Sequence, residues 1–321
     1  MAKDKKELIS IVVPCYNEQE SLPLFYEEIT KVAKDMKEVD FEFLFINDGS
    51  KDKTLEILRD LSKKDKRVRY ISFSRNFGKE AGIYAGLSNA NGDFIATMDA
   101  DLQDPPAMIK EMYKDIKEEG YDCVALYTKS HEGYSIVRKA LTSAWYKFID
   151  KISTSHQMPG ARDFRLMTRQ MLDSILSMPE YNRYTKGIFG FVGFNTKWIS
   201  YDAPDRVAGT TKFNLIKLIK YALEGIVAFS TSPLMLSAYL GLFFCFIAFI
   251  AIIVIIVKTL IWGDPVGGWP SMACLVVFLG GVQLFFLGII GIYLSKIYLE
   301  VKHRPIYIAK ETEETGKKDE K

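Results

Sequence analysis

Two long stretches without a charged residue occupy the C-terminal third of the 321-residue chain. They run from Leu234 to Val257 and from Ser271 to Ser295. A helix of about 20 apolar residues spans the hydrocarbon of a bilayer, and both stretches are longer. The alternative is a pair of buried core helices, but a soluble core rarely needs two uncharged helices of this length. The pattern therefore predicts two membrane spans after a separate, charge-rich N-terminal part.

The charges around these stretches predict their orientation. The linker, residues 258–270, contains one Lys and one Asp, and its Trp262 and Trp269 suit a membrane interface. Basic side chains gather after the second stretch, at Lys296, Lys302, His303, Arg304 and Lys310. This bias predicts a multi-pass protein of the plasma membrane with both termini and the N-terminal part in the cytoplasm. No secretory signal precedes the first expected strand, and the polar tail from Lys310 onward is expected to be disordered.

Composition argues against two kinds of chemistry. The formal net charge is +2, so no overall charge favours a nucleic-acid partner. The four cysteines have no CxxC or zinc-like spacing, and we expect them to be reduced and without a disulfide or metal role. They are Cys15, Cys123, Cys245 and Cys274.

Apolar strands and amphipathic helices alternate along the N-terminal part. Strands are expected over Leu8–Val13, Phe41–Ile46, Val68–Phe73 and Phe94–Met98, and helices over Ser21–Met36, Thr54–Lys63 and Lys79–Ala90. Such alternation predicts an α/β fold with a mostly parallel sheet. Ligands bind beyond the carboxyl ends of such strands, so chemistry is expected in four loops. These loops are residues 14–18, 47–50, 75–79 and 99–103.

The loop after the fourth expected strand carries two carboxylates, Asp99 and Asp101. Carboxylates at i and i+2 on a turn can converge on one Mg²⁺ or Mn²⁺ ion, which can in turn hold a diphosphate. The alternative is a solvated acidic turn. The chain has no glycine fingerprint after its first strand, no GxxxxGK loop and no HExxH motif. A nucleotide would therefore be held by side chains and a metal ion.

Six motifs in order carry a family resemblance over nearly the whole chain. Ser10–Glu18, Asn47–Ser50 and Asp99–Pro106 resemble glycosyltransferase family 2. A closer similarity to the polyisoprenyl-phosphate glycosyltransferases, among them dolichol-phosphate mannose synthases and bactoprenol glucosyltransferases, rests on Ser74–Glu80, Asp163–Met167 and Arg206–Phe213. The resemblance implies a GT-A (Rossmann-like) fold, a mostly parallel α/β domain followed by interfacial helices and two transmembrane helices.

The resemblance also implies roles on the nucleotide side. Pro14, Tyr16, Asn17 and Glu18 would cradle the base and ribose; the alternative is a helix-capping turn. Asp48 would accept a hydrogen bond from uracil or ribose, or else belong to an Asx turn. Lys79 would meet the diphosphate or base, or else be a solvated helix start. Nucleotide-sugar contacts are further implied for Asp99, Ala100 and Asp101. Asp99, Asp101 and Gln103 would hold Mg²⁺ or Mn²⁺, and Asp104 is expected to be structural.

A polyprenyl phosphate is the implied acceptor. It is already an anion, so the site needs cations to hold it in line more than it needs a base. Candidates for binding the lipid phosphate are Arg138, Thr142, Arg165, Arg206 and Lys212; for each cation the alternative is a surface residue. Asp163 would be the base, if one is used; otherwise it orients Arg162 or Arg165 or binds a sugar hydroxyl. Asp163 and Asp101 are the expected catalytic residues.

These expectations combine into one domain plan. Residues 1–210 would form the catalytic domain, 211–232 an amphipathic interfacial helix, 233–297 the two spans and 298–321 a cytosolic tail. The implied reaction is inverting transfer of a hexose from a nucleotide sugar, with UDP favoured over GDP, to undecaprenyl phosphate, in a homo-oligomer such as a tetramer. Alternatives are a non-catalytic membrane scaffold and a processive polysaccharide synthase, although the QxxRW motif of such synthases is absent from the sequence. The identity of the sugar stays open.

Overall fold

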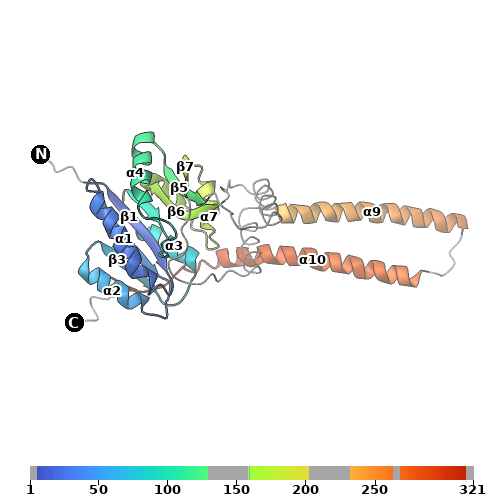
Figure 1. Cartoon of the computed structure of the whole chain (residues 1–321). Helices are drawn as coiled ribbons and strands as arrows, with labels where there is room; N and C mark the ends of the chain where they lie inside the picture. Colours follow the sequence, from blue (N-terminus) through green and yellow to red (C-terminus); the bar gives the residue numbers. More distant parts are fainter. Residues whose placement is uncertain (1–5, 129–157, 159, 202–231, 263–267, 316–321) are drawn as a thin grey trace. The chain divides into compact units, whose positions relative to one another are not determined.

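A computed structural model describes residues 6–128, 158, 160–201, 232–262 and 268–315 of the chain (Figure 1). The chain divides into two compact units, residues 1–220 with 304–321, and residues 221–303. The elements of the first unit are β1 Leu8–Cys15, α1 Ser21–Asp35, β2 Asp40–Asn47, α2 Thr54–Lys64, β3 Val68–Phe73, α3 Lys79–Asn89, β4 Phe94–Thr97, α4 Met108–Glu119, β5 Cys123–Thr128, β6 Ala161–Thr168, α6 Arg169–Leu176, α7 Thr185–Phe191, β7 Thr196–Tyr201 and β8 Ala309–Thr312. The second unit contains α9 Ser232–Trp262 and α10 Trp269–Val301.

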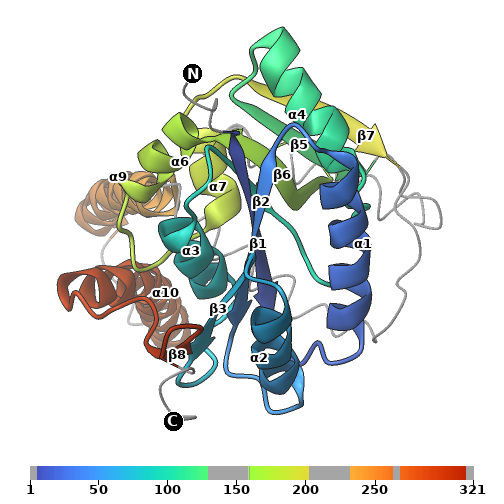
Figure 2. The ribbon, with the colours of Figure 1, turned by 90° about the vertical axis from the view of Figure 1, so that its left-hand side faces the viewer.

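The described strands form one sheet in the order β7-β5-β6-β4-β1-β2-β3-β8. The four strands expected from the sequence, β1 to β4, are mutually parallel, which confirms the predicted α/β sheet. The flanking part is mixed, because β6 runs antiparallel to β4 and β5, and β8 runs antiparallel to β3. Helices α1, α2 and α4 cover one face of the sheet, and α3, α6 and α7 cover the other (Figure 2).

The core lies on both faces of the central strands, which explains their continuous apolar runs. Ile9, Ile11 and Val13 of β1 are fully buried. On one face, the ring of Phe25 from α1 meets that of Phe45 from β2 edge to face, with centroids 6.2 Å apart. Each such buried side chain contributes about 1.5–3 kcal/mol. The packing gives a rigid edge from which the loops project.

Helix α3 packs unusually close to the sheet. A Cβ atom added at Gly86 would lie 2.1 Å from Cγ1 of Val12 in β1, so only glycine fits there. The neighbouring Ala85 is also fully buried. This close packing fixes the first residue of the helix, Lys79, beside the carboxyl end of the sheet.

Strand β6 brings a distant part of the chain to the same edge. Its register against β4 pairs Phe94 with Thr168 and Thr97 with Arg165. Continued by two residues, that antiparallel register sets Asp99 opposite Asp163. The hydroxyl of Thr97 donates to the backbone carbonyl of Asp163 over 2.6 Å. This bond joins β4 to β6 beside the two aspartates.

The segment after α10 returns to the sheet, so the expected disorder from Lys310 onward is wrong for the described residues. Ser74 donates its backbone N–H to the carbonyl of Ile308 over 3.0 Å, and β8 then pairs with β3. Glu311 accepts from the Arg59 guanidinium over 2.8 and 2.6 Å and from the Tyr70 hydroxyl over 2.6 Å. The charged segment that suggested disorder is thus held in place by polar partners on α2 and β3, Arg59 and Tyr70.

Helices α9 and α10 contain the two apolar stretches and confirm that both are helical. Apolar windows long enough to cross a membrane run over Pro233–Ala251 and Phe278–Val301, with hydropathies of 2.4 and 1.9. The rings of Phe244 and Phe278 meet with centroids 6.1 Å apart, so the two helices pack on each other. Helix α9 continues to Trp262, which makes the segment between the helices shorter than the expected linker.

Candidate active site

The acidic turn after β4 lies at the carboxyl edge of the sheet, as predicted. Asp99 and Asp101 follow the strand directly. An Asp101 carboxylate oxygen, Oδ1, accepts from the backbone N–H of Gln103 over 3.2 Å. Leu102 between them has φ of +57°, a left-handed conformation that is rare for a leucine. The turn is therefore tightly folded rather than a loose solvated loop.

Two lysines and two aspartates form one ion-pair cluster beside this turn. Lys79 Nζ lies 2.6 Å from Oδ1 and 2.8 Å from Oδ2 of Asp99. The same ammonium donates to Oδ2 of Asp163. Lys186 Nζ lies 3.3 Å from the other oxygen of Asp163, Oδ1. Lys79, Asp99, Asp163 and Lys186, called here the lysine–aspartate cluster, come from four different segments of the chain.

The cluster gives its two aspartates opposite protonation behaviour. Removal from water raises the pKa of Asp99, and repulsion from Asp163 adds to the rise although Lys79 opposes it. Burial acts on Asp163 in the same direction, but Lys79 and Lys186 outweigh it and hold the pKa of Asp163 well below its usual range. A general base works best with a pKa near the working pH. The low pKa of Asp163 favours a role in positioning charge over a role as base.

A second set of contacts holds the far side of the acidic turn. Asp104 is almost completely buried and accepts from Arg162 Nε over 2.9 Å and from the Tyr201 hydroxyl. Arg162 also donates to the Gln103 side chain over 3.2 Å. The expected structural role of Asp104 is confirmed. Because Arg162 pairs with Asp104, orientation of Arg162 by Asp163 is not what the geometry supports.

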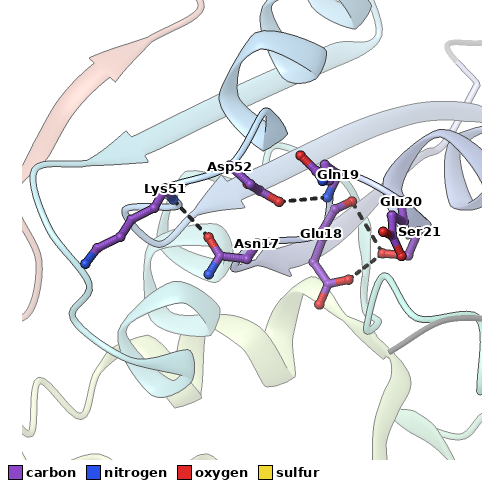
Figure 3. A pocket seen from close by; sticks show the side chains of 7 residues that line it. All are labelled: Asn17, Glu18, Gln19, Glu20, Ser21, Lys51 and Asp52. Atoms are coloured by element: carbon purple, nitrogen blue, oxygen red, sulfur yellow. Dashed lines mark hydrogen bonds between the residues drawn. The ribbon is translucent and has the colours of Figure 1, made fainter. Parts of the chain in front are cut away.

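The loops after β1 and β2 line a pocket of about 410 Å³ at the same edge (Figure 3). Asn17 has φ of +56°, and its side-chain oxygen accepts from the backbone N–H of Lys51 over 2.9 Å. Gln19 donates its backbone N–H to Asp52 over 3.1 Å. Glu18 accepts from the hydroxyl of Ser21 at the start of α1. Asn17 thus ties the loop after β1 to the loop after β2, and Glu18 contacts a side chain in the first turn of α1, a helix without a side-chain cap bond.

Tyr16 and Glu18 are the groups in this loop that suit a ligand. The Tyr16 ring is 42% exposed and offers a stacking face. Burial raises the pKa of Glu18, and the charges of Asp101 and Asp99 raise it further. Glu18 thus lies near enough to the acidic turn for their charges to interact.

Asp48 holds the backbone of a neighbouring loop. It is 4% exposed, and its oxygens accept from the backbone N–H groups of Phe77 and Gly78 over 2.6 and 3.0 Å. The adjacent Gly49 has φ of +64°, and a Cβ there would lie 2.4 Å from the backbone of Arg75. Asp48 thus braces the loop that leads into Lys79, and the contact with uracil or ribose stays a prediction.

Arg165, one of the predicted lipid-phosphate ligands, is buried. It is 3% exposed, its guanidinium lies 3.6 Å over the Phe189 ring, and burial lowers its pKa. This burial gives Arg165 a packing role in the structure, and its contact with a lipid phosphate stays a prediction. The remaining candidates lie outside the described residues: Arg138, Thr142, Arg206 and Lys212.

Lys186 is the residue of this site that sequence reasoning missed. It is held in place by Glu80, which accepts from the backbone N–H of the preceding Thr185 over 2.8 Å and from its hydroxyl. Lys186 itself also donates to the carbonyl of Ala161 over 3.2 Å. Its only local signal was a single cation in the apolar segment Thr185–Phe191.

The predicted metal ligands fit a hard divalent cation in their chemistry. Asp99 and Asp101 supply carboxylate oxygens, the ligand type that such cations prefer. Burial raises the pKa of Asp99, and repulsion from Asp163 and, more weakly, Asp101 adds to the rise. Gln103 already accepts from Arg162. Within the described residues, no group of three or more His, Cys, Asp or Glu is arranged to hold a metal ion. The protein therefore offers two carboxylates, and the ligand would supply further oxygens.

Comparison with known proteins identifies the family. The model of "Glycosyl transferase family 2" matches residues 10–176. The chain is 43% identical to the "Bactoprenol glucosyl transferase" of Shigella phage SfV over 94% of this chain and 98% of that one. It is 42% identical to the "Prophage bactoprenol glucosyl transferase homolog" of Escherichia coli (strain K12), with the same coverage. A solved glucosyl-3-phosphoglycerate synthase from Mycobacterium tuberculosis is 17% identical, with a TM-score of 0.48 over 69% of this chain and 78% of that one. The chain thus belongs to glycosyltransferase family 2, has its GT-A fold, and is similar over nearly its whole length to bactoprenol glucosyl transferases.

Proposed function

We propose that this glycosyltransferase moves a hexose from a nucleotide sugar, UDP-linked, to a polyprenyl phosphate such as undecaprenyl phosphate. The observation that carries the proposal is the lysine–aspartate cluster beside the acidic turn, in a chain that also has two long apolar helices. The names of the relatives support the acceptor, because bactoprenol is a polyprenyl lipid. The product would be a lipid-linked sugar donor for the cell envelope.

The donor half of the site would be built from the loops after β1 and β4. Pro14, Tyr16, Asn17 and Glu18 are proposed to contact the nucleoside, and Lys79 the diphosphate. Asp99 and Asp101 are proposed to hold Mg²⁺ or Mn²⁺, which when bound neutralises charge on the departing nucleoside diphosphate. The supporting observation is that these loops lie at the same edge of the sheet, with the charges of Asp99 and Asp101 near Glu18.

The acceptor half needs cations and no strong base. A phosphate monoester is ionised at neutral pH, and its oxygen attacks the anomeric carbon directly as the bond to the diphosphate breaks. This displacement inverts the anomeric centre, so an α-linked donor gives a β-linked product. The low pKa of Asp163 supports a reaction without a general base. Arg138, Thr142, Arg206 and Lys212 remain the proposed ligands of the lipid phosphate.

The apolar helices support a membrane location for this reaction. Large apolar side chains on α9 and α10, such as Leu242 and Leu284, are 72% exposed in the single chain. Exposure of this kind suits lipid contact. We propose a multi-pass protein of the plasma membrane with the catalytic domain and both termini in the cytoplasm. A homo-oligomer remains a prediction from the family resemblance.

The test is transfer by the full-length protein in detergent micelles. Radiolabelled UDP- and GDP-sugars are supplied one at a time with undecaprenyl phosphate and Mg²⁺ or Mn²⁺, and lipid-linked product is extracted. We expect product with one UDP-hexose and none when the lipid phosphate is omitted. Absence of product with every donor would favour the scaffold alternative, and a polymer in place of a single lipid-linked sugar would favour the synthase alternative.

A further inference from the structure

Lys79 forms an ion pair with Asp99, the carboxylate on which the proposed metal site depends. Its ammonium contacts both oxygens of Asp99, at 2.6 and 2.8 Å. A divalent cation bound to Asp99 would need the same oxygens, at the short distances that hard cations require. Two cations cannot share one carboxylate edge without strong repulsion at such short range. The ammonium and the ion therefore compete for Asp99.

The structure gives Lys79 a way to leave. Its side chain is 45% exposed, so its long stem can swing toward solvent. The residue before it, Gly78, has φ of +98° and no atom within 4 Å of an added Cβ, so the chain around it is not crowded. When Lys79 leaves, Asp163 keeps Lys186 at 3.3 Å. Asp163 therefore still has a cationic partner after Lys79 has moved away.

The charges of the site make the exchange balanced. Asp99, Asp101 and Asp163 carry three negative charges against the two positive charges of Lys79 and Lys186, an excess of one negative charge. A divalent ion alone reverses the sign of that excess. An ion that arrives with a nucleotide sugar, whose diphosphate carries two negative charges, restores it. The three N–H donors of the freed ammonium then have phosphate oxygens to bind.

We propose that Lys79 is the resident counter-ion of Asp99 and exchanges with the divalent ion only when a nucleoside diphosphate is present to receive it. The inference rests on the proposed function, because it takes Asp99 as the metal ligand. It makes metal and nucleotide binding mutually dependent: each raises the affinity of the other by the same factor. The protein then avoids holding a metal ion at an empty donor site.

The test measures metal binding and requires no turnover. Full-length protein in detergent is titrated with Mn²⁺, with and without UDP, and free Mn²⁺ is read from its electron paramagnetic resonance signal. Wild type is compared with Lys79→Met, which removes the competing charge at similar length. Lys186→Met is the matched control, because it removes one charge that faces Asp163 rather than Asp99. Lys79→Arg keeps the charge, and thermal unfolding checks that each variant is folded.

We expect wild type to bind Mn²⁺ weakly alone and about tenfold more tightly with UDP, within the usual range of coupling. Lys79→Met should bind Mn²⁺ alone about tenfold more tightly than wild type and lose most of the effect of UDP. Lys186→Met and Lys79→Arg should keep the UDP effect. Equal changes in the two Met variants, or an unchanged Lys79→Met, would overturn the exchange.

Asp99→Asn separates this inference from the proposed function. If Asp99→Asn loses Mn²⁺ binding while Lys79→Met behaves like wild type, the metal assignment stands and the exchange is refuted. If Asp99→Asn binds Mn²⁺ as wild type does, Asp99 is not the ligand, and the metal assignment is refuted together with the exchange.

Discussion

The two edges of the central sheet each hold a partly or fully buried carboxylate that faces cations, but they are built differently. At the amino edge, Glu42 is 6% exposed and accepts from Ser10, from both the backbone and the side chain of Asn91, and from Arg69 over 2.6 Å. At the carboxyl edge, Asp99 faces one long, half-exposed lysine. One carboxylate is enclosed by several donors, and the other by a single group that can move.

The difference predicts a structural role for the carboxylate at the amino edge and a functional role for the one at the carboxyl edge. Backbone N–H groups and short side chains lose little freedom when they bind a carboxylate, so the Glu42 cluster is a fixed part of the fold. A lysine has a flexible stem and exchanges partners readily. Substitutions at the two edges should therefore affect different properties, stability at the amino edge and catalysis at the carboxyl edge.

Asp99→Asn should have the largest effect on catalysis, and it should not lower the stability of the fold. We expect sugar transfer to fall by roughly 1,000-fold, because the proposed metal loses a charged ligand next to the leaving group. The unfolding temperature should stay the same or rise, because the pKa of Asp99 is raised and its charge is unfavourable in the folded state. Initial rates and thermal unfolding of the same preparations check both. A clear loss of stability with little loss of activity would contradict the comparison.

Glu42→Gln should show the reverse pattern. A carboxamide places an NH₂ group against donors that now bind a carboxylate, so we expect a loss of about 3 kcal/mol in the free energy of unfolding. Thermal and denaturant unfolding measure this loss, and activity per folded molecule at low temperature should stay within about twofold of wild type. If catalysis falls as steeply as for Asp99→Asn, the two edges are not separable.

Asp163→Asn should reduce turnover by roughly 10- to 100-fold, because Lys79 and Lys186 lose the carboxylate that positions them. A positioning role leaves the shape of the pH–rate profile unchanged, and that profile is the measurement. The loss of one ionisation from the profile of the variant would instead identify Asp163 as the base.

Acid should weaken the amino edge specifically. Burial raises the pKa of Glu42, but hydrogen bonds from Asn91, Ser10 and Arg69 outweigh it and leave the pKa lowered. A lowered folded-state pKa means stability that is present above the unfolded value of about 4.3 and is lost as the pH falls through the folded value. The unfolding-temperature difference between wild type and Glu42→Gln should therefore shrink below about pH 4. A difference that stays constant from pH 7 to pH 3.5 would show that charge is not its source.

Glu313→Gln should have the smallest effect. Glu313 accepts from Arg69 Nε over 2.8 Å at the periphery of the Glu42 cluster, and Arg69 keeps its bond to Glu42 when Glu313 is neutral. Peripheral ion pairs contribute at most about 1 kcal/mol. Unfolding temperatures of the single variants and of the double variant with Glu42→Gln give the coupling between them. A loss of stability as large as that of Glu42→Gln would show that Glu313 of the C-terminal segment, and not Glu42 alone, holds this cluster together.

Local patterns were sufficient to predict the central part of the fold. The strand expected over Val68–Phe73 is confirmed at both ends, because buried parallel strands have continuous apolar runs. The expected gathering of strand-end loops is also confirmed, since Asp99 and Lys79 meet at one edge. Both results need only the strand periodicity and the rule that parallel strands share their carboxyl edge.

Features that depend on distant pairing were not predictable in this way. Asp99 lies opposite Asp163 because of the antiparallel register of β6 against β4, and no local pattern encodes that register. Arg165 lies in the same strand, and only the position of Phe189 shows that its cation faces a ring. The strand β8 was missed because it is short and contains two charged residues, and because Arg59, the partner of its Glu311, lies 252 residues away in the sequence.

The position of β8 in the chain also sets an order of assembly during synthesis. The edge of β3 is covered by residues 309–312, which leave the ribosome after both apolar helices, residues 232–262 and 269–301. A nascent catalytic domain therefore presents an open β-edge, the kind of surface that pairs with other chains, until the helices have been made. Completion of the sheet therefore depends on prior synthesis of both apolar helices, and a truncated chain that lacks β8 would keep an exposed β-edge.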